Sequence, residues 1–237
     1  MKHVVTVAPI FTVLLAVACG GGSSSSPSSP STPATPTPTG GTVTVIVSSD
    51  KAVGTGFGND RVEPMSYYIS VGQVFQGAAQ GQRLPTVTAS ALKFELPAQV
   101  SGRTVTKATL RLSVFEVRRD IEWNGPTATM AIQLRANAFM TDWDPASLSW
   151  NAWASLGYQS DGESRAPAPN SLEPPVAFDV TTIVRNWASG AWKNYGLRLA
   201  ADTYTDPGGD SYGISNFYSS TRYEKPDQRP QLIIEYQ

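Results

Sequence analysis

Residues 105–114 read Val-Thr-Lys-Ala-Thr-Leu-Arg-Leu-Ser-Val, and this stretch decides the fold class. Polar and apolar residues alternate along it, with the apolar side chains at Ala108, Leu110, Leu112 and Val114. Successive side chains of a β-strand point to opposite faces of its sheet, so the alternation predicts a strand with one buried and one solvent-exposed face. Antiparallel sheets that pack face to face have strands of this kind.

The same alternation recurs along the rest of the chain. It is found in further stretches that begin at Val43, Leu92, Ile132, Val176, Leu197 and Leu232. Only residues 181–190 read as a helix, in which Thr181 can cap the start and Gly190 can end it. Ile183 and Trp187 lie four residues apart on one face of that helix. The pattern therefore predicts an all-β domain with one short helix over residues 43–237.

The composition excludes most familiar hydrolase chemistry. The only histidine and the only cysteine are His3 and Cys19, so the chain beyond Cys19 has no imidazole and no thiol. It cannot form a Ser-His-Asp or Cys-His nucleophile, a zinc site with such ligands, or a disulfide within the domain. A glycosidase that uses only carboxylates remains compatible with the composition, but no acidic residue has a motif that suggests one. We expect that the protein is not an enzyme, and its net charge of −1 gives no general attraction for nucleic acid.

Residues 1–18 are typical of a secretory signal peptide. A short positive start is followed by the uncharged run from Val4 to Ala18, which is shorter than the ~20 residues of a membrane-spanning helix. Small residues then precede Cys19, which resembles the bacterial lipobox, although Ala16 stands where that motif more often has Leu. We expect lipid attachment at Cys19; the alternative is ordinary cleavage near Ala18, which leaves an incidental cysteine.

Residues 19–42 then read as a lipidated tether. From Gly20 to Thr42 the chain contains only Gly, Ser, Thr, Pro and one Ala, a composition that has no apolar surface to offset the entropy of folding. Gly20 stands where a signal for retention in the inner membrane often has Asp. We expect an exported lipoprotein on the outer membrane or the cell surface that contacts the membrane through its lipid anchor only.

Further motifs carry a resemblance to a known family. They are residues 90–97 (SALKFELP), Trp143-Asp144 ahead of 147–151 (SLSWN), 178–181 (FDVT), 184–187 (VRNW), 194–199 (NYGLRL) and 229–236 (RPQLIIEY). Together with residues 105–114, they resemble the bacterial and archaeal DNRLRE domains, which are grouped with carbohydrate-binding module family 96. The Phe-Asp-Val-Thr turn is also similar to one in the arm domain of transforming-growth-factor propeptides. The resemblance spans roughly residues 43–237 and implies an antiparallel jelly-roll-like β-sandwich that acts as an accessory or surface module.

The chemistry of the residues in these motifs indicates that they stabilise the fold by packing and by capping. Asp179 precedes the predicted helix, where a carboxylate can accept backbone N–H groups. Trp187 shares a face with Ile183 and can close one end of the sandwich. Trp143 and Trp150 have Ser, Thr and Asp neighbours, which is typical of aromatic residues anchored at turns.

Trp123 is the tryptophan that we expect to bind ligand. A carbohydrate site needs an exposed aromatic face, and an acidic polysaccharide adds a need for Lys or Arg. Trp123 follows the adjacent residues Arg118 and Arg119, and these three residues are the predicted polysaccharide site. Arg118 and Arg119 point to opposite faces of any strand, so both can serve only where the chain has left the sheet. The alternative is an exposed hairpin whose tryptophan covers the edge of the core.

The sequence offers further candidates in its loops. The aromatic ones are Trp192, which can instead pack on the predicted helix, and Tyr158, Tyr204 and Tyr212. Asp202, Asp206 and Asp210 lie four residues apart around Pro-Gly-Gly and form a candidate calcium site, although Asp-Pro-Gly-Gly is also a plain turn signal. We expect no cofactor, with a structural calcium ion as the alternative.

The expected function is that of an exported, surface-tethered lipoprotein with a non-catalytic module for polysaccharide binding or adhesion, with an acidic polysaccharide as a candidate ligand. The alternative is a purely structural module or one that binds a protein partner, for which an apolar surface patch would be typical. A polysaccharide-degrading enzyme that depends on carboxylates alone is the third hypothesis.

Overall fold

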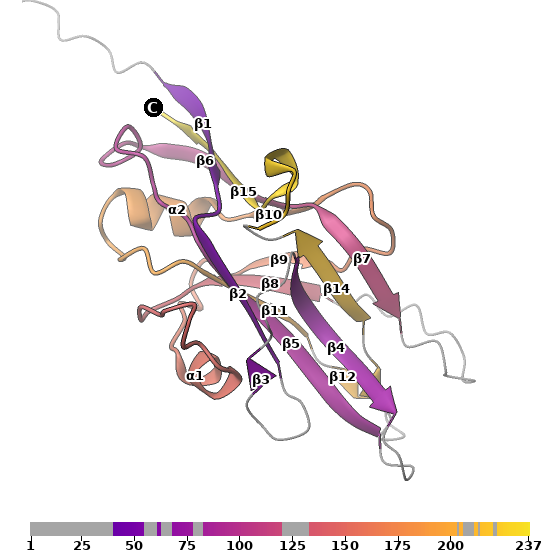
Figure 1. The fold of residues 1–237 in the computed structure, drawn as a ribbon. Coiled ribbons are helices and arrows are strands. Elements are labelled where there is room, and N and C mark those ends of the chain that lie inside the picture. Colours follow the sequence, from indigo (N-terminus) through magenta and orange to yellow (C-terminus); the bar gives the residue numbers. More distant parts are fainter. Residues whose placement is uncertain are drawn as a thin grey trace, which may run out of the picture. The chain divides into compact units, whose positions relative to one another are not determined.

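The computed structural model describes residues 40–54, 61–62, 68–77, 83–119, 133–202, 204–205, 211–212, 214–219 and 222–237. These residues form strands in antiparallel sheets (Figure 1), so the predicted all-β class is confirmed. The predicted signal peptide, Cys19 and nearly all of the tether lie outside the described residues.

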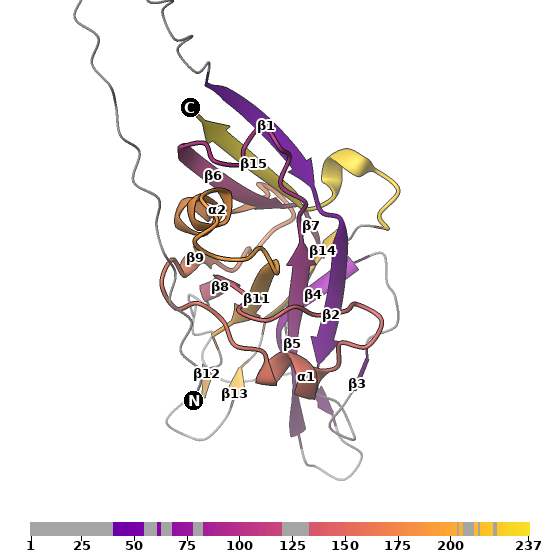
Figure 2. The same cartoon turned by 90° about the vertical axis from the view of Figure 1, so that its left-hand side faces the viewer.

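A four-stranded sheet contains both ends of the domain. Its strand order is β1 (Gly41–Ile46), β15 (Gln231–Tyr236), β6 (Val105–Leu112) and β10 (Val176–Asp179). The first strand pairs with the last from Gly41 opposite Tyr236 to Ile46 opposite Gln231 (Figure 2). β1 begins two residues before the predicted start of the domain at 43, so the last residues of the predicted tether, Gly41 and Thr42, belong to a strand.

A larger sheet packs against the small one. Its main path runs β7 (Val114–Arg119), β14 (Ile214–Ser219), β4 (Tyr68–Gly77), β5 (Arg83–Lys93), β11 (Leu197–Ala201), β8 (Gln133–Ala138) and β9 (Ser164–Pro167). Off this path, β2 (Ser49–Gly54) pairs with β5 and with β3 (Arg61–Val62). A separate pair consists of β12 (Tyr204–Thr205) and β13 (Ser211–Tyr212).

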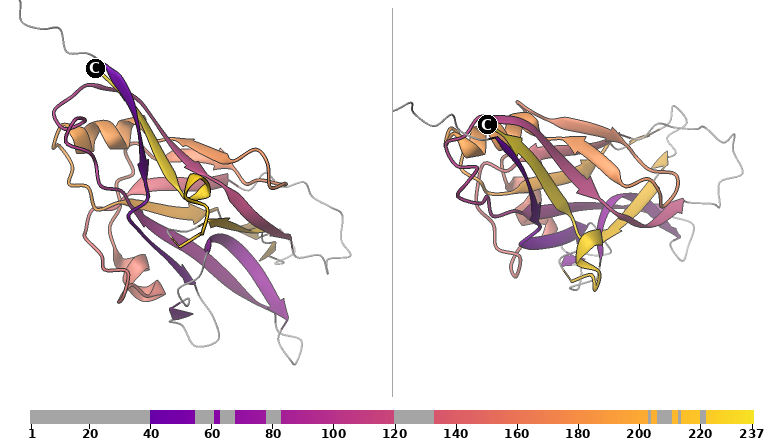
Figure 3. Two further views of the ribbon diagram at one scale, coloured as in Figure 1. Left: turned by 45° about the horizontal axis from the view of Figure 1, so that its top comes forward. Right: turned by 90° about the horizontal axis from the view of Figure 1, so that it is seen from above.

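The chain passes between the two sheets at two short corners. Val47 and Ser48 lead from β1 of the small sheet to β2 of the large one, and the Ser48 N–H donates to the Lys93 carbonyl. Ser113 separates β6 of the small sheet from β7 of the large one in the same way. The two views in Figure 3 show the sheets from further sides. These corners connect the layers covalently and leave an apolar core between them.

The core between the sheets contains the apolar residues that the alternation predicted. Leu110, Leu112, Leu232 and Ile234 of the small sheet and Leu92, Leu134 and Leu199 of the large sheet are nearly or fully buried in one cluster. Their polar neighbours point outward: Arg111 and Glu235 are exposed. The alternation in these strands is therefore confirmed.

Helix α2 (Thr181–Ala188) covers one end of that core. Figure 2 shows the helix beside the ends of the strands. Ile183, Val184 and Trp187 are buried in the same cluster, which confirms the predicted place of Trp187. Gly190 follows the helix with φ +77°, a left-handed conformation that suits glycine, so the predicted end is also confirmed.

The start of α2 differs from the prediction that Thr181 caps it. The N-cap residue is Val180, and Asp179 Oδ1 accepts both the Thr181 N–H at 3.0 Å and the Thr181 hydroxyl at 2.6 Å. The Thr181 hydroxyl oxygen instead accepts the Ala108 N–H at 2.9 Å and so joins the helix to β6. Because the Asp179 carboxylate already accepts the N–H at the start of the helix, the Thr181 hydroxyl oxygen can accept a hydrogen bond from the neighbouring strand.

A second helix, α1 (Trp150–Ser155), was not predicted from the sequence. It has six residues, and Ser149 Oγ caps it by accepting the Ala152 N–H at 3.3 Å. It lies over the end of β2 and β5 (Figures 1 and 2). A third short helical turn, η1 (Pro226–Gln228), precedes β15.

Candidate functional site

The predicted polysaccharide site lies mostly outside the described residues. Trp123 is one of the residues that the structure leaves undescribed, and so are the side chains of Arg118 and Arg119. The backbone of the two arginines is described: β7 runs through Arg119, and Arg118 and Arg119 pair with Ser215 and Ile214 of β14. The chain is therefore still in the sheet at both arginines, and the site itself stays a prediction.

The predicted calcium site is described only at Asp202. Asp206 and Asp210 lie outside the described residues. The Asp202 carboxylate contacts two arginines, with Oδ1 2.8 Å from Arg135 Nε and Oδ2 3.2 Å from Arg165 Nη1. Within the described part of the chain, no group of three or more His, Cys, Asp and Glu side chains is arranged to hold a metal ion.

The other aromatic candidates have different surroundings. Trp192 is half-buried against the core. Its backbone N–H donates to the Asn186 carbonyl of α2, in line with packing on the helix. Tyr204 and Tyr212 pair through their backbones, and their side chains lie outside the described residues. Tyr158 lies on the outer face of the large sheet, which faces away from the core, and it is 40% exposed.

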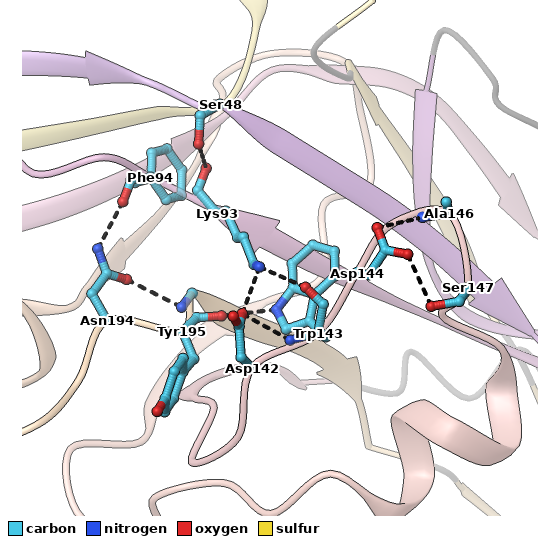
Figure 4. Close-up of polar contacts among 11 residues, drawn as sticks. Ser48, Lys93, Phe94, Asp142, Trp143, Asp144, Ala146, Ser147, Asn194 and Tyr195 are labelled. Atoms are coloured by element: carbon cyan, nitrogen blue, oxygen red, sulfur yellow. Dashed lines mark hydrogen bonds and ion pairs between the residues drawn. The ribbon is translucent and has the colours of Figure 1, made fainter.

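A polar brace holds the segment that leads to this outer face. Lys93, the last residue of β5, donates to Asp142 Oδ1 at 2.6 Å and to the Trp143 carbonyl at 2.5 Å (Figure 4). Its Nζ also lies 4.8 Å from the Trp143 ring centroid. The side-chain hydrogen bond from Lys93, with one from the Trp143 N–H, lowers the pKa of Asp142 below its ordinary value. Because one lysine contacts three groups, it fixes this segment beside the end of β5.

Residues 194–196, which lead into β11, complete the brace. Trp143 Nε1 donates to the Tyr195 carbonyl at 2.8 Å, and Asn194 Nδ2 donates to the Phe94 carbonyl at 2.7 Å (Figure 4). Gly196 has φ +93°, and a Cβ there would lie 2.2 Å from the Leu92 carbonyl oxygen. Only glycine fits this approach of the two strands, which explains the Asn-Tyr-Gly motif physically.

A second apolar cluster lies on the outer face of the large sheet. Its floor consists of the small residues Val53, Ala89, Ala91 and Ala200 on β2, β5 and β11. Its cover is formed by Phe139, Trp143, Leu148 and Trp153, all from residues 139–153. Alanine side chains leave space above the strands, so the large rings of the cover pack directly on the sheet.

Arg198 connects this cover to the surface. It is the outward residue of β11 between the core residues Leu197 and Leu199, and its Cζ lies 4.1 Å from the Trp153 ring centroid and 4.4 Å from that of Tyr158. Trp150 in turn stacks on Trp153, with centroids 5.2 Å apart and planes inclined by 22°. We call Trp150, Trp153, Tyr158 and Arg198 the arginine–aromatic cluster. The solvent exposure of its residues ranges from that of the buried Trp153 to that of the exposed Tyr158.

A polar network continues the arginine–aromatic cluster across β8 and β9. Asn137, the partner of Arg198 on β8, donates to Glu163 Oε2 at 3.1 Å and to the Gln159 carbonyl at 3.3 Å. Arg165 Nε donates to Glu163 Oε1 at 2.8 Å. Burial acts to raise the pKa of Glu163, but the hydrogen bonds from Asn137 and Arg165 outweigh it and hold that pKa below the ordinary value.

The charges of this face are largely paired. Asp202 bridges Arg135 and Arg165, and Glu163 pairs with Arg165. In the part of the chain that the structure describes, Arg198 has no ion pair with a carboxylate, and its positive charge contacts ring faces instead. Burial, together with the nearby Arg135, lowers the pKa of Arg198 below its usual range. The face therefore offers a flat aromatic ring beside hydrogen-bonding groups that are held in fixed positions.

Comparison with known proteins found no match. No protein-family model matches the chain, and no curated protein matches it. No helix among the described residues has the length and the apolar character needed to cross a membrane.

Proposed function

We propose that residues 43–237 are a non-catalytic polysaccharide-binding or adhesion module of an exported lipoprotein. The observation that supports this best is the arginine–aromatic cluster, which presents a partly exposed ring on the same face as the paired charges of Glu163 and Arg165. Sugar rings stack on aromatic faces, and their hydroxyl groups bind to such polar neighbours. The resemblance to DNRLRE domains and carbohydrate-binding module family 96 supports the same class of function.

The attachment of this module to a membrane is part of the proposal. The uncharged N-terminal run, the small residues before Cys19 and the Ser/Pro-rich tether favour acylation at Cys19. Mass spectrometry of the mature N-terminus tests it directly: a mass that includes two or three acyl chains on Cys19 supports the lipoprotein. A free thiol at Cys19, or cleavage after it, would show that the protein is not a lipoprotein.

Trp123, with whichever of Arg118 and Arg119 shares its face of β7, remains the proposed surface for an acidic polysaccharide. Arg presents a planar fork to a carboxylate, and such contacts weaken as salt is added. Titration of polygalacturonate into the wild type and into Trp123→Ala, each at low and high salt, tests this surface. Thermal melts of both proteins show whether a loss of affinity reflects a lost contact or a lost fold.

Affinity electrophoresis in a panel of neutral and acidic polysaccharides tests the function itself. We expect retarded migration in at least one gel, without release of shorter sugars during prolonged incubation with that polysaccharide. Release of sugars would favour the carboxylate-dependent enzyme. Unchanged migration in every gel would favour the structural or protein-binding module.

A further inference from the structure

Tyr158 has two ring faces in different surroundings. The Arg198 guanidinium lies over one of them, with its Cζ 4.4 Å from the ring centroid. Tyr158 is nevertheless 40% exposed, so the contact with Arg198 leaves a large part of the residue open to solvent. An exposed ring that is covered from behind by a cation is a flat platform that points to solvent.

The platform is fixed before any ligand arrives. Backbone hydrogen bonds of 2.8 Å hold the residues on both sides of Tyr158, from Met140 N to the Gly157 carbonyl and from Gln159 N to the Ala138 carbonyl. Arg198 also lies over Trp153, which is only 3% exposed, so the support behind Tyr158 is anchored in the outer cluster. A ring held in this way loses little conformational freedom on binding, which favours affinity.

The surroundings of the platform suit a sugar. Glu163 and Arg165 supply hydrogen-bond acceptors and donors from β9 and the residue before it, where Asn137 also joins Glu163 to Gln159. A pyranose has an apolar C–H face and a rim of hydroxyl groups, which is the pattern that such a surface complements.

The charges of the site favour an uncharged sugar. The carboxylates of Glu163 and Asp202 are each paired with Arg165, and Asp202 also with Arg135, so no net field from these pairs attracts an anion. The unpaired cation, Arg198, lies behind the ring, and its Nη1 is buried. A ligand on the open face of Tyr158 therefore cannot form the bidentate contact that an arginine makes with a carboxylate.

We infer that the open face of Tyr158 is the platform of a saccharide subsite for an uncharged pyranose unit, separate from the predicted Trp123 site. The inference rests on the proposed function of the domain. It differs from the Trp123 proposal in its residues, in the charge of its ligand and in its response to salt.

The test compares matched variants of the full chain, each carrying Cys19→Ser so that no lipid is attached. Their affinities are measured for neutral polysaccharides of the mannan, xylan, glucan and galactan types at low and high salt. Tyr158→Ala should weaken binding of the neutral ligand about tenfold or more, which is at least about 1.4 kcal/mol. Tyr158→Phe keeps the ring and should bind like the wild type, and salt should have little effect.

Two further variants keep the result interpretable. Phe115→Ala removes a ring of similar exposure, 44%, outside the cluster and should leave affinity unchanged. Tyr158→Leu keeps an apolar side chain over Arg198 but removes the flat ring, so it should lose binding with a melting temperature close to that of the wild type. Neutral binding that survives both Tyr158→Ala and Tyr158→Leu would overturn the Tyr158 subsite and leave the proposed function standing. A wild type that binds no polysaccharide would overturn the proposed function itself.

Discussion

The two faces of the large sheet are both covered, but by different means. On the inner face, branched residues such as Leu92 and Leu199 pack against the small sheet. On the outer face, Ala91 and Ala200 of the same strands lie beneath aromatic residues from 139–153. The inner face is therefore packed sheet against sheet, and the outer face is a floor of small side chains below a separate aromatic cover.

This difference separates stability from candidate function. The apolar residues of the cluster between the sheets are nearly all inaccessible to solvent, and the buried Ser90 on the same face of β5 donates to the Ser70 carbonyl. The outer cluster merges into Arg198, Tyr158 and the paired charges of β8 and β9. On this outer face, the paired charges and the exposed Tyr158 gather where the cover ends, which is where a ligand can reach them.

Leu199→Ala tests the inner face and should have the largest effect. Leu199 is 1% exposed, so the truncation leaves a cavity between the two sheets. We expect a loss of about 2–5 kcal/mol in the free energy of unfolding, measured by urea denaturation. A loss below about 1 kcal/mol would show that the inner face is not tightly packed.

Ala91→Leu tests the outer face and should cost less. Ala91 is fully buried beneath the aromatic cover, and a larger side chain has to push that cover away from the sheet. We expect a loss of about 1–3 kcal/mol and a changed near-UV circular dichroism signal from the tryptophans. Ala177→Leu is the matched control, because Ala177 is exposed on β10 and should tolerate leucine. Equal effects of the two substitutions would contradict the described cover.

The inner face could be predicted from the sequence, and the outer face could not. Alternation of branched apolar and polar residues reveals a strand, and it located β6, β10 and β15 correctly. On the outer face the alternating residues include Ala91, Arg198 and Ala200, which in sequence look like a solvent-exposed face. Nothing in a strand pattern indicates that a distant segment covers it.

The arginine–aromatic cluster was missed for the same reason. Tyr158 appeared in the sequence as one loop tyrosine among several, and Arg198 as the polar residue between Leu197 and Leu199. Their contact depends on α1 and the turn that follows it, and a helix of six residues is too short to show a clear period. The spacing of Trp150 and Trp153 by three residues was the one available signal, because residues three apart in a helix lie side by side.

Lys93→Met tests how the cover is attached, with a smaller expected effect. The substitution keeps the apolar stem of the side chain but removes the hydrogen bonds to Asp142 and to the Trp143 carbonyl. Because Asp142 is largely exposed, we expect a loss of only about 0.5–1.5 kcal/mol in the free energy of unfolding. Hydrogen exchange should speed up in residues 139–149 and stay unchanged in β6 and β15. Uniformly faster exchange would mean that the brace stabilises the whole domain and not the cover alone.

Acid should weaken the attachment of the outer face, with the smallest effect of these changes. Asp142 and Glu163 both belong to this face, and hydrogen bonds hold the pKa of each below its ordinary value, 3.8 and 4.5 respectively. A carboxyl whose pKa is lower in the folded state stabilises the fold above its unfolded pKa, and this contribution is lost as the pH falls through the folded value. The melting temperature should therefore be flat near neutral pH and decline below about pH 4.5. Asp179 adds to the decline because its carboxylate accepts hydrogen bonds from Thr181 at the start of α2.

The double variant Asp142→Asn with Glu163→Gln tests this prediction and should show a shallower decline of the melting temperature with falling pH. Leu199→Ala should lower the melting temperature at every pH without changing that slope. A double variant that declines as steeply as the wild type would show that the paired charges of the outer face contribute nothing to its attachment.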